Sequence, residues 1–203
     1  MPTSTFFNLP REKRDKLLAA IKEELSRVPF EEVSINKIVR SAGIARGSFY
    51  QYFHDKPDML GYILSGFQEQ LMGHIRDSLE HSGGDVFRLF TDILDFSILF
   101  SQGDDAPGLH RQLFTDRRIH AMLFQARSRI CTEMELLPEL RSRISTENLS
   151  LQGEEDFLDM VETLMAVTRD ASFQIVSSTQ SHGEVRRRYL NKLALLKRGY
   201  AKA

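Results

Sequence analysis

The chain has 203 residues, of which 41% are hydrophobic and 27% charged, values typical of a folded protein that buries its own core. A single cysteine, Cys131, excludes an intrachain disulfide. There is no basic segment followed by an apolar one at the start, and no apolar run long enough to cross a bilayer. We therefore expect a cytoplasmic protein with no membrane partner.

The net charge of −1 hides an asymmetry along the chain. No Asp or Glu occurs between residues 33 and 54, where three residues are basic (Lys37, Arg40 and Arg46). An acid-free window indicates either a surface that meets a polyanion or, by chance, an ordinary solvated face.

The first elements are predicted to be three helices. After Pro10, apolar residues recur at steps of three and four up to Val28 and predict a helix that stops before Pro29. A short helix follows, with Ser34 as its N-cap and Gly43 at its end. Another runs from about residue 45 to 54, with Phe49 and Phe53 on one face. We expect both rings to point at the core, held by Ile38 and the first helix.

A long helix is predicted next. The run Asp55-Lys56-Pro57-Asp58 combines an N-cap acid, a first-turn proline and a second acid. The apolar stripe behind it reaches Leu79, before Gly83-Gly84 ends the helix.

The remaining chain is also predicted to be helical, in segments 85–101, 106–115 and 117–136, with a break at Pro138 and an irregular stretch over 138–152. Two long amphipathic helices follow, separated at Ser181-His182-Gly183. The fold class is therefore all-α. We expect a three-helix domain over residues 1–56 and a larger helical domain over 57–203.

The block from Ser34 to Lys56 carries the most specific signal. Two short helices joined through Ala42-Gly43-Ile44 indicate a helix-turn-helix. Arginine, small and hydroxyl-bearing side chains on the second helix are those that bind phosphates and base edges in a major groove. The candidate DNA-binding residues are Ser34, Asn36, Arg46, Gly47, Ser48, Tyr50, Tyr52 and Lys56. Each also has a structural reading: Ser34 as a plain helix cap, for instance, or Tyr52 as a packed ring.

This block resembles the DNA-binding signature of the TetR/AcrR family of bacterial transcriptional regulators. The resemblance rests on Ser34, Ala42-Gly43-Ile44, the run Arg46-Gly47-Ser48-Phe49-Tyr50-Gln51-Tyr52-Phe53, and Lys56, and covers about 50 N-terminal residues. It departs at Ala45, where the family often has a hydroxyl. The resemblance implies that Ser34, Tyr50, Tyr52 and Lys56 contact phosphates and that residues 46–48 meet the groove. It also implies a homeodomain-like three-helix head, a cavity for an effector, and a homodimer formed through the two C-terminal helices.

The resemblance thus favours a repressor that a small apolar molecule releases from a palindromic double-stranded DNA operator. The alternative is a DNA-bound scaffold that recruits proteins without an effector. Candidate effector-binding residues are Phe67, Leu71, Ile75, Phe90, Phe96, Phe100, Phe114, Met122 and Phe124, with His74, His110 or Gln112 as polar anchors. A solid core is the competing interpretation of these residues.

Neither an enzyme nor a cofactor is indicated by the sequence. The histidines and Cys131 are dispersed without metal-ligand spacing, and neither a nucleophile elbow nor a phosphate-binding glycine loop is present. We therefore expect no metal and no catalytic residue.

Overall fold

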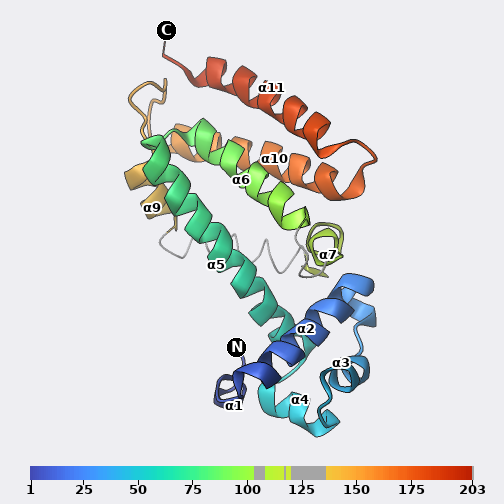
Figure 1. Cartoon of the computed structure of the whole chain (residues 1–203). Helices are drawn as coiled ribbons and strands as arrows, with labels where there is room; N and C mark the ends of the chain where they lie inside the picture. Colours follow the sequence, from blue (N-terminus) through green and yellow to red (C-terminus); the bar gives the residue numbers. More distant parts are fainter. Residues whose placement is uncertain (103–107, 117, 120–135, 203) are drawn as a thin grey trace. The chain divides into compact units, whose positions relative to one another are not determined.

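The computed structural model describes residues 1–102, 108–116, 118–119 and 136–202, and every regular element within these ranges is a helix (Figure 1). The all-α fold class is confirmed. The chain divides into two compact units. Residues 1–69 and 102–126 form the first, and residues 70–101 and 127–203 the second.

The first unit begins with α1 (Ser4–Phe7), α2 (Arg11–Arg27) and the 3₁₀ turn η1 (Phe30–Glu32). Helix α2 follows Pro10 and ends before Pro29, as predicted. Helix α1 was not predicted, because four residues are too few to show a helical period. Its Phe6 is fully buried, and the centroid of its ring lies 5.1 Å from that of Phe53.

The buried stripe of α2 contains one charged side chain. Its members are Leu17, Ala20, Ile21, Glu24 and Leu25. The spacing is the expected helical one, but Glu24 stands at a position where apolar periodicity alone would place a hydrophobic residue. Only 3% of Glu24 is exposed.

Three further helices follow at the predicted places: α3 (Ile35–Ala42), α4 (Arg46–Tyr52) and α5 (Lys56–Ser82). Helix α4 ends two residues before the predicted end at residue 54. At the start of α5, the Asp55 carboxylate accepts the N–H of Asp58 at 2.7 Å, and the Asp58 carboxylate accepts that of His54 at 3.0 Å. These reciprocal bonds satisfy main-chain donors that the helix cannot pair.

The chain continues with α6 (Val86–Gln102), α7 (Leu109–Thr115) and α9 (Leu136–Arg143). Helices α6 and α7 confirm the predicted segments, whereas the predicted helix 117–136 lies almost entirely outside the described residues. The break predicted at Pro138 is wrong, since Pro138 is the third residue of α9. A proline is tolerated there because first-turn N–H groups have no partner within the helix.

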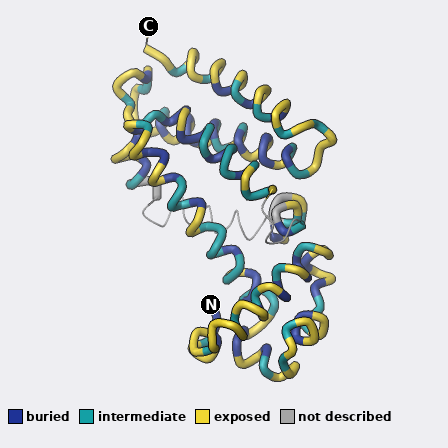
Figure 2. Tube along the Cα trace, in the orientation of Figure 1, coloured by how far each residue is buried: buried dark blue, intermediate teal, exposed yellow. Residues whose placement is uncertain are grey.

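Helices α10 (Glu154–Ser177) and α11 (His182–Tyr200) lie side by side in the second unit (Figure 1). A buried stripe of α11, formed by Val185, Tyr189 and Leu193, packs inside the unit, while the rest of the helix is largely exposed (Figure 2). The Tyr189 hydroxyl donates to the Phe90 carbonyl at 2.8 Å and lies 2.7 Å from the Thr168 hydroxyl. Burial raises the pKa of Tyr189, so the phenol keeps its proton.

Candidate nucleic-acid interface

The turn between α3 and α4 depends on one glycine. Gly43 adopts a left-handed conformation with φ of 67°, which costs glycine no steric strain. The following N–H, of Ile44, returns to the Val39 carbonyl at 2.9 Å. This is the usual hydrogen-bond closure of a helix that ends at a glycine, and it turns the chain directly into α4.

The inner face of α4 is held by aromatic packing. Phe49 and Phe53 are both fully buried, with ring centroids 5.6 Å apart. Ile38 of α3 is fully buried as well. The interior positions predicted for these three residues are confirmed, and they fix which face of α4 remains outside.

The outer face of α4 carries the candidate groove-binding residues. Arg46, Gly47 and Tyr50 are exposed, Tyr50 to 50%, and Ser48 is half-buried. Asn36 is exposed on α3. Within the part of the chain that the structure describes, no hydrogen bond or ion pair engages the side chain of Arg46 or Asn36, so both are available to a ligand. Ala45 precedes α4 without a side-chain cap.

Tyr52 lies in a different environment from Tyr50. It is only 9% exposed, and its main-chain carbonyl accepts the Thr3 N–H at 2.9 Å. This burial agrees with the packing alternative raised from the sequence. Any contact of Tyr52 with DNA would have to use the small part of the residue that remains exposed.

Two predicted phosphate-binding residues are placed beside each other in the fold, at the entry to α3. Ser34 is the N-cap residue of α3, but its hydroxyl makes no capping hydrogen bond. The Lys56 ammonium donates to the carbonyls of Glu31, at 3.2 Å, and Val33, at 3.1 Å, and lies over the Phe30 ring. Lys56 therefore holds the segment before α3 and keeps one of its three N–H donors free for a phosphate.

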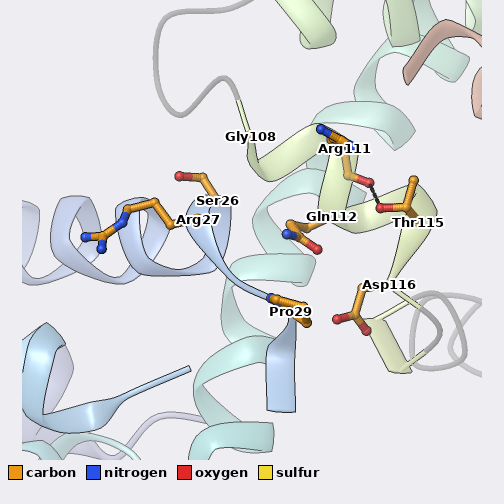
Figure 3. A pocket seen from close by; sticks show the side chains of 8 residues that line it. All are labelled: Ser26, Arg27, Pro29, Gly108, Arg111, Gln112, Thr115 and Asp116. Carbon is orange, nitrogen blue, oxygen red and sulfur yellow. Dashed lines mark hydrogen bonds between the residues drawn. The ribbon is translucent and has the colours of Figure 1, made fainter. Parts of the chain in front are cut away.

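An open pocket of about 590 Å³ lies between the end of α2 and α7 (Figure 3). Its lining residues are Ser26, Arg27, Pro29, Gly108, Arg111, Gln112, Thr115 and Asp116. The main chains of the two helices meet at Gly108, where an added Cβ would lie far inside van der Waals contact with the Ser26 carbonyl oxygen. The sequence gives no signal for this close approach, although Gln112 was among the candidate anchors.

The candidate effector-binding residues are spread over several helices. Leu71, Ile75 and Phe90 are buried, whereas Phe67, Phe96 and Phe100 are half-buried. The His74 ring lies 5.2 Å from that of Phe96, and its Nε2 lies 3.1 Å from the Asp92 carbonyl oxygen. The side chains of Phe114, Met122, Phe124 and His110 lie outside the described residues.

The described residues were compared with the requirements of a metal site and of a membrane-spanning helix. No group of three or more His, Cys, Asp or Glu side chains in these ranges could hold a metal ion. None of the helices in the described ranges is both long and apolar enough to span a membrane.

The pair α3–turn–α4, with an exposed arginine and an exposed tyrosine on its second helix, has the arrangement of a DNA-binding helix-turn-helix. The family described as "Bacterial regulatory proteins, tetR family" matches residues 17–63, and a tetracycline repressor-like C-terminal domain matches residues 85–200. The chain belongs to this family, whose members are transcriptional regulators and not enzymes.

Individual relatives agree with this membership. YvdT, an uncharacterised HTH-type transcriptional regulator of Bacillus subtilis (strain 168), is 29% identical over 93 residues, which are 44% of this chain and 46% of that protein. The chain thus spans under half the length of this curated relative. A TetR-family regulator from Chloroflexus aurantiacus J-10-FL has a TM-score of 0.63 and 25% identity over the whole of both chains. One from Rhodococcus sp. has a TM-score of 0.63 and 16% identity, covering 92% of this chain and 99% of its own, and shows the fold alone.

Proposed function

We propose that this regulator is a ligand-responsive repressor that binds a palindromic operator as a homodimer. The observation that carries the proposal is the two-sided nature of α4. Its Phe49 is fully buried, while Arg46 and the neighbouring Tyr50 are exposed to solvent. A cationic side chain presented on a firmly packed helix is what direct reading of base edges requires.

The proposed DNA-binding surface combines α3, α4 and the start of α5, within a DNA-binding domain of residues 1–56. Arg46, Gly47 and Ser48 meet the groove, and Asn36 reaches a base. The phosphate contacts fall to Ser34, Tyr50, Tyr52 and the remaining donor of Lys56. The absence of acids from residue 33 to residue 54 keeps this surface attractive to a polyanion.

The homodimer is proposed to form through α10 and α11. Large apolar side chains are exposed on both helices: Leu158 to 39%, Phe173 to 45% and Leu195 to 61%. An interface with two-fold symmetry would bury the copy of each side chain from both protomers. It would also present two α4 helices to successive half-sites. We place such a protein in the cytoplasm, where the DNA is.

The effector is proposed to be a largely apolar molecule held by the second domain. The residues that we propose for it are Phe67, Leu71, Ile75, Phe90, Phe96, Phe100, Phe114, Met122 and Phe124. A ligand that binds one dimer geometry tenfold more tightly than the other, at each of two sites, would lower operator occupancy about a hundredfold. The support for this part is the aromatic content of the domain.

Selection of binding sites from a random duplex library tests the proposal. We expect enrichment of an imperfect palindrome whose half-sites lie about one helical turn apart. Failure to enrich any sequence at low salt would contradict the operator-binding role. The enriched duplex then serves in a release assay with apolar compounds. If no compound in a broad screen releases it, the protein is instead a DNA-bound scaffold without an effector.

A further inference from the structure

The buried carboxylate of Glu24 is a polar group that the proposed DNA contacts do not use. It belongs to the inward stripe of α2 and is 3% exposed. Burial of a carboxylate is costly unless hydrogen bonds and opposite charges compensate for the lost water. Its partners therefore indicate why an acid is present at a position where a leucine would pack.

Two of those partners lie at the beginning of α3, and a third, Arg27, ends α2. The Oε1 atom accepts the main-chain N–H of Ser34 at 3.1 Å and lies 3.8 Å from the Lys37 ammonium. The Oε2 atom has the Arg27 guanidinium at 3.9 Å. Among these described contacts, the one at hydrogen-bond distance is thus the one to Ser34, the residue that begins α3.

The same segment is held from a second helix. Lys56 of α5 donates to the carbonyls of Glu31 and Val33, so side chains of opposite charge hold the main chain of the segment that leads into α3. The Ser34 hydroxyl itself makes no capping bond. Glu24 thus anchors Ser34 through its main chain and leaves its hydroxyl free for DNA.

We propose that Glu24 is a positioning residue for DNA binding. It fixes where α3 begins, and through the tight turn at Gly43 it also fixes α4, without touching DNA itself. This inference rests on the proposed operator-binding function. We attribute the effect on DNA binding to the hydrogen bond that the carboxylate oxygen accepts from the Ser34 N–H, and not to the negative charge.

Two substitutions distinguish the position of the acceptor oxygen of Glu24 from the charge of its side chain. Glu24→Gln keeps an acceptor oxygen at the same distance from the main chain and removes the charge. Glu24→Asp keeps the charge and is one methylene shorter, so it withdraws the acceptor from the Ser34 N–H. Glu24→Met is similar in length, removes the acceptor altogether, and suits a buried site if Glu24→Asp does not fold. Glu23→Asp, on the exposed neighbour, is the matched control.

Fluorescence anisotropy with the duplex enriched by selection, fluorescein-labelled and titrated at several salt concentrations, provides the measurement. Circular dichroism melts set an assay temperature at which every variant is folded. We expect Glu24→Asp and Glu24→Met to bind about tenfold more weakly, because in each half of the dimer the Ser34 N–H loses its acceptor and the start of α3 is no longer held in place. The slope of log K against log salt should stay unchanged, since every phosphate-binding side chain is still present. Glu24→Gln should remain within about twofold of the wild type, and Glu23→Asp should match it.

Wild-type affinity in Glu24→Asp and Glu24→Met would overturn the inference. An equal loss in Glu24→Gln and Glu24→Asp would also overturn it, because the charge would then be the cause. The proposed operator-binding function fails separately, when the wild-type protein enriches no duplex at all.

Discussion

The Asp116 carboxylate accepts the main-chain N–H of Phe30 at 2.7 Å, across 86 positions of sequence. Next to it, Arg118 pairs with Glu31 and lies over the Phe30 ring, 5.5 Å from its centroid. Residues just after α7 therefore hold η1, the turn that leads into α3. Because Ser34 follows η1 closely, these contacts belong to the support of the candidate DNA-binding surface.

The close approach of the Gly108 and Ser26 main chains makes the packing of α7 against α2 sensitive to a single added methyl group. In Gly108→Ala the new Cβ would collide with the main chain of Ser26 and move α7 away from α2. We expect a loss of about 1–3 kcal/mol of unfolding free energy, the usual cost of overpacking, measured by urea denaturation. Gly61→Ala is the control, since nothing lies within 4 Å of the added atom. It should be neutral or stabilising, as alanine favours a helix. Equal unfolding free energies of the two variants would contradict this prediction, because α7 would then move away from α2 without a cost in stability.

Lys56 is expected to act on every DNA sequence alike. Lys56→Met should weaken binding to specific and random duplexes by the same factor, and should lower the salt slope by about 0.9 for each phosphate that the ammonium neutralises. It should also lower the melting temperature, because two bonds to main-chain carbonyls disappear. Lys16→Met removes the same charge from an exposed ion pair on α2 and should leave the slope unchanged. A slope that stays constant in Lys56→Met would restrict Lys56 to holding the segment before α3.

Arg46 is expected to act on sequence preference instead. If its guanidinium reads a guanine, Arg46→Ala should lose about 1–3 kcal/mol of discrimination at one position in each half-site. Repeating the selection with the variant, and comparing base frequencies at each position with those of the wild type, measures this change. Identical base preferences in both proteins would assign the reading of sequence to other residues.

Phe173 is expected to contribute to the dimer. Placing a charge there in Phe173→Glu should produce monomers at micromolar concentration, because an interface with two-fold symmetry would contain the charge twice and each buried phenylalanine contributes about 1.5–3 kcal/mol. Sedimentation velocity distinguishes the two states. Leu99→Glu, on an α6 leucine that is 67% exposed, should remain dimeric. A wild-type protein that sediments as a monomer would remove the basis of this prediction.

Asp85 links stability to pH. Burial alone would raise its pKa, but hydrogen bonds from Lys197 and from the N–H groups of Arg88 and Phe87 lower it below the ordinary value. A lowered folded-state pKa contributes stability above the unfolded value of about 3.9, and this contribution disappears as pH falls through the folded value.

Asp85→Asn tests this linkage because it keeps a capping oxygen and removes the charge. Since the Asp85 side chain is 40% exposed, solvent screening limits the loss at pH 7 to about 1 kcal/mol or less. Urea denaturation of both proteins at pH 7 and near pH 3 should show the difference shrinking in acid. A difference of the same size at both pH values would mean that the charge of Asp85 has no part in it.

Elements governed by neighbouring residues were predicted from the sequence. Ser34 and Gly43 bound α3 at the expected positions, and Asp55 and Asp58 form the expected start of α5. Phe49 and Phe53 were placed in the interior by their spacing alone. Caps, prolines, glycines and apolar periods act over at most a few turns, so they can be read without any knowledge of the fold.

Only the tertiary structure decided which polar side chains hold the segment that leads into α3. A glutamate in α2 and a lysine at the start of α5 would both be expected in water, yet Glu24 is buried against Ser34, and Lys56 bonds to carbonyls 23 and 25 positions earlier in the chain. Tyr50 and Tyr52 are two residues apart in one helix, and only the packing around α4 leaves the first exposed and buries the second. These outcomes depend on partners distant in sequence, which meet only when the helices pack, and no local pattern encodes such a meeting.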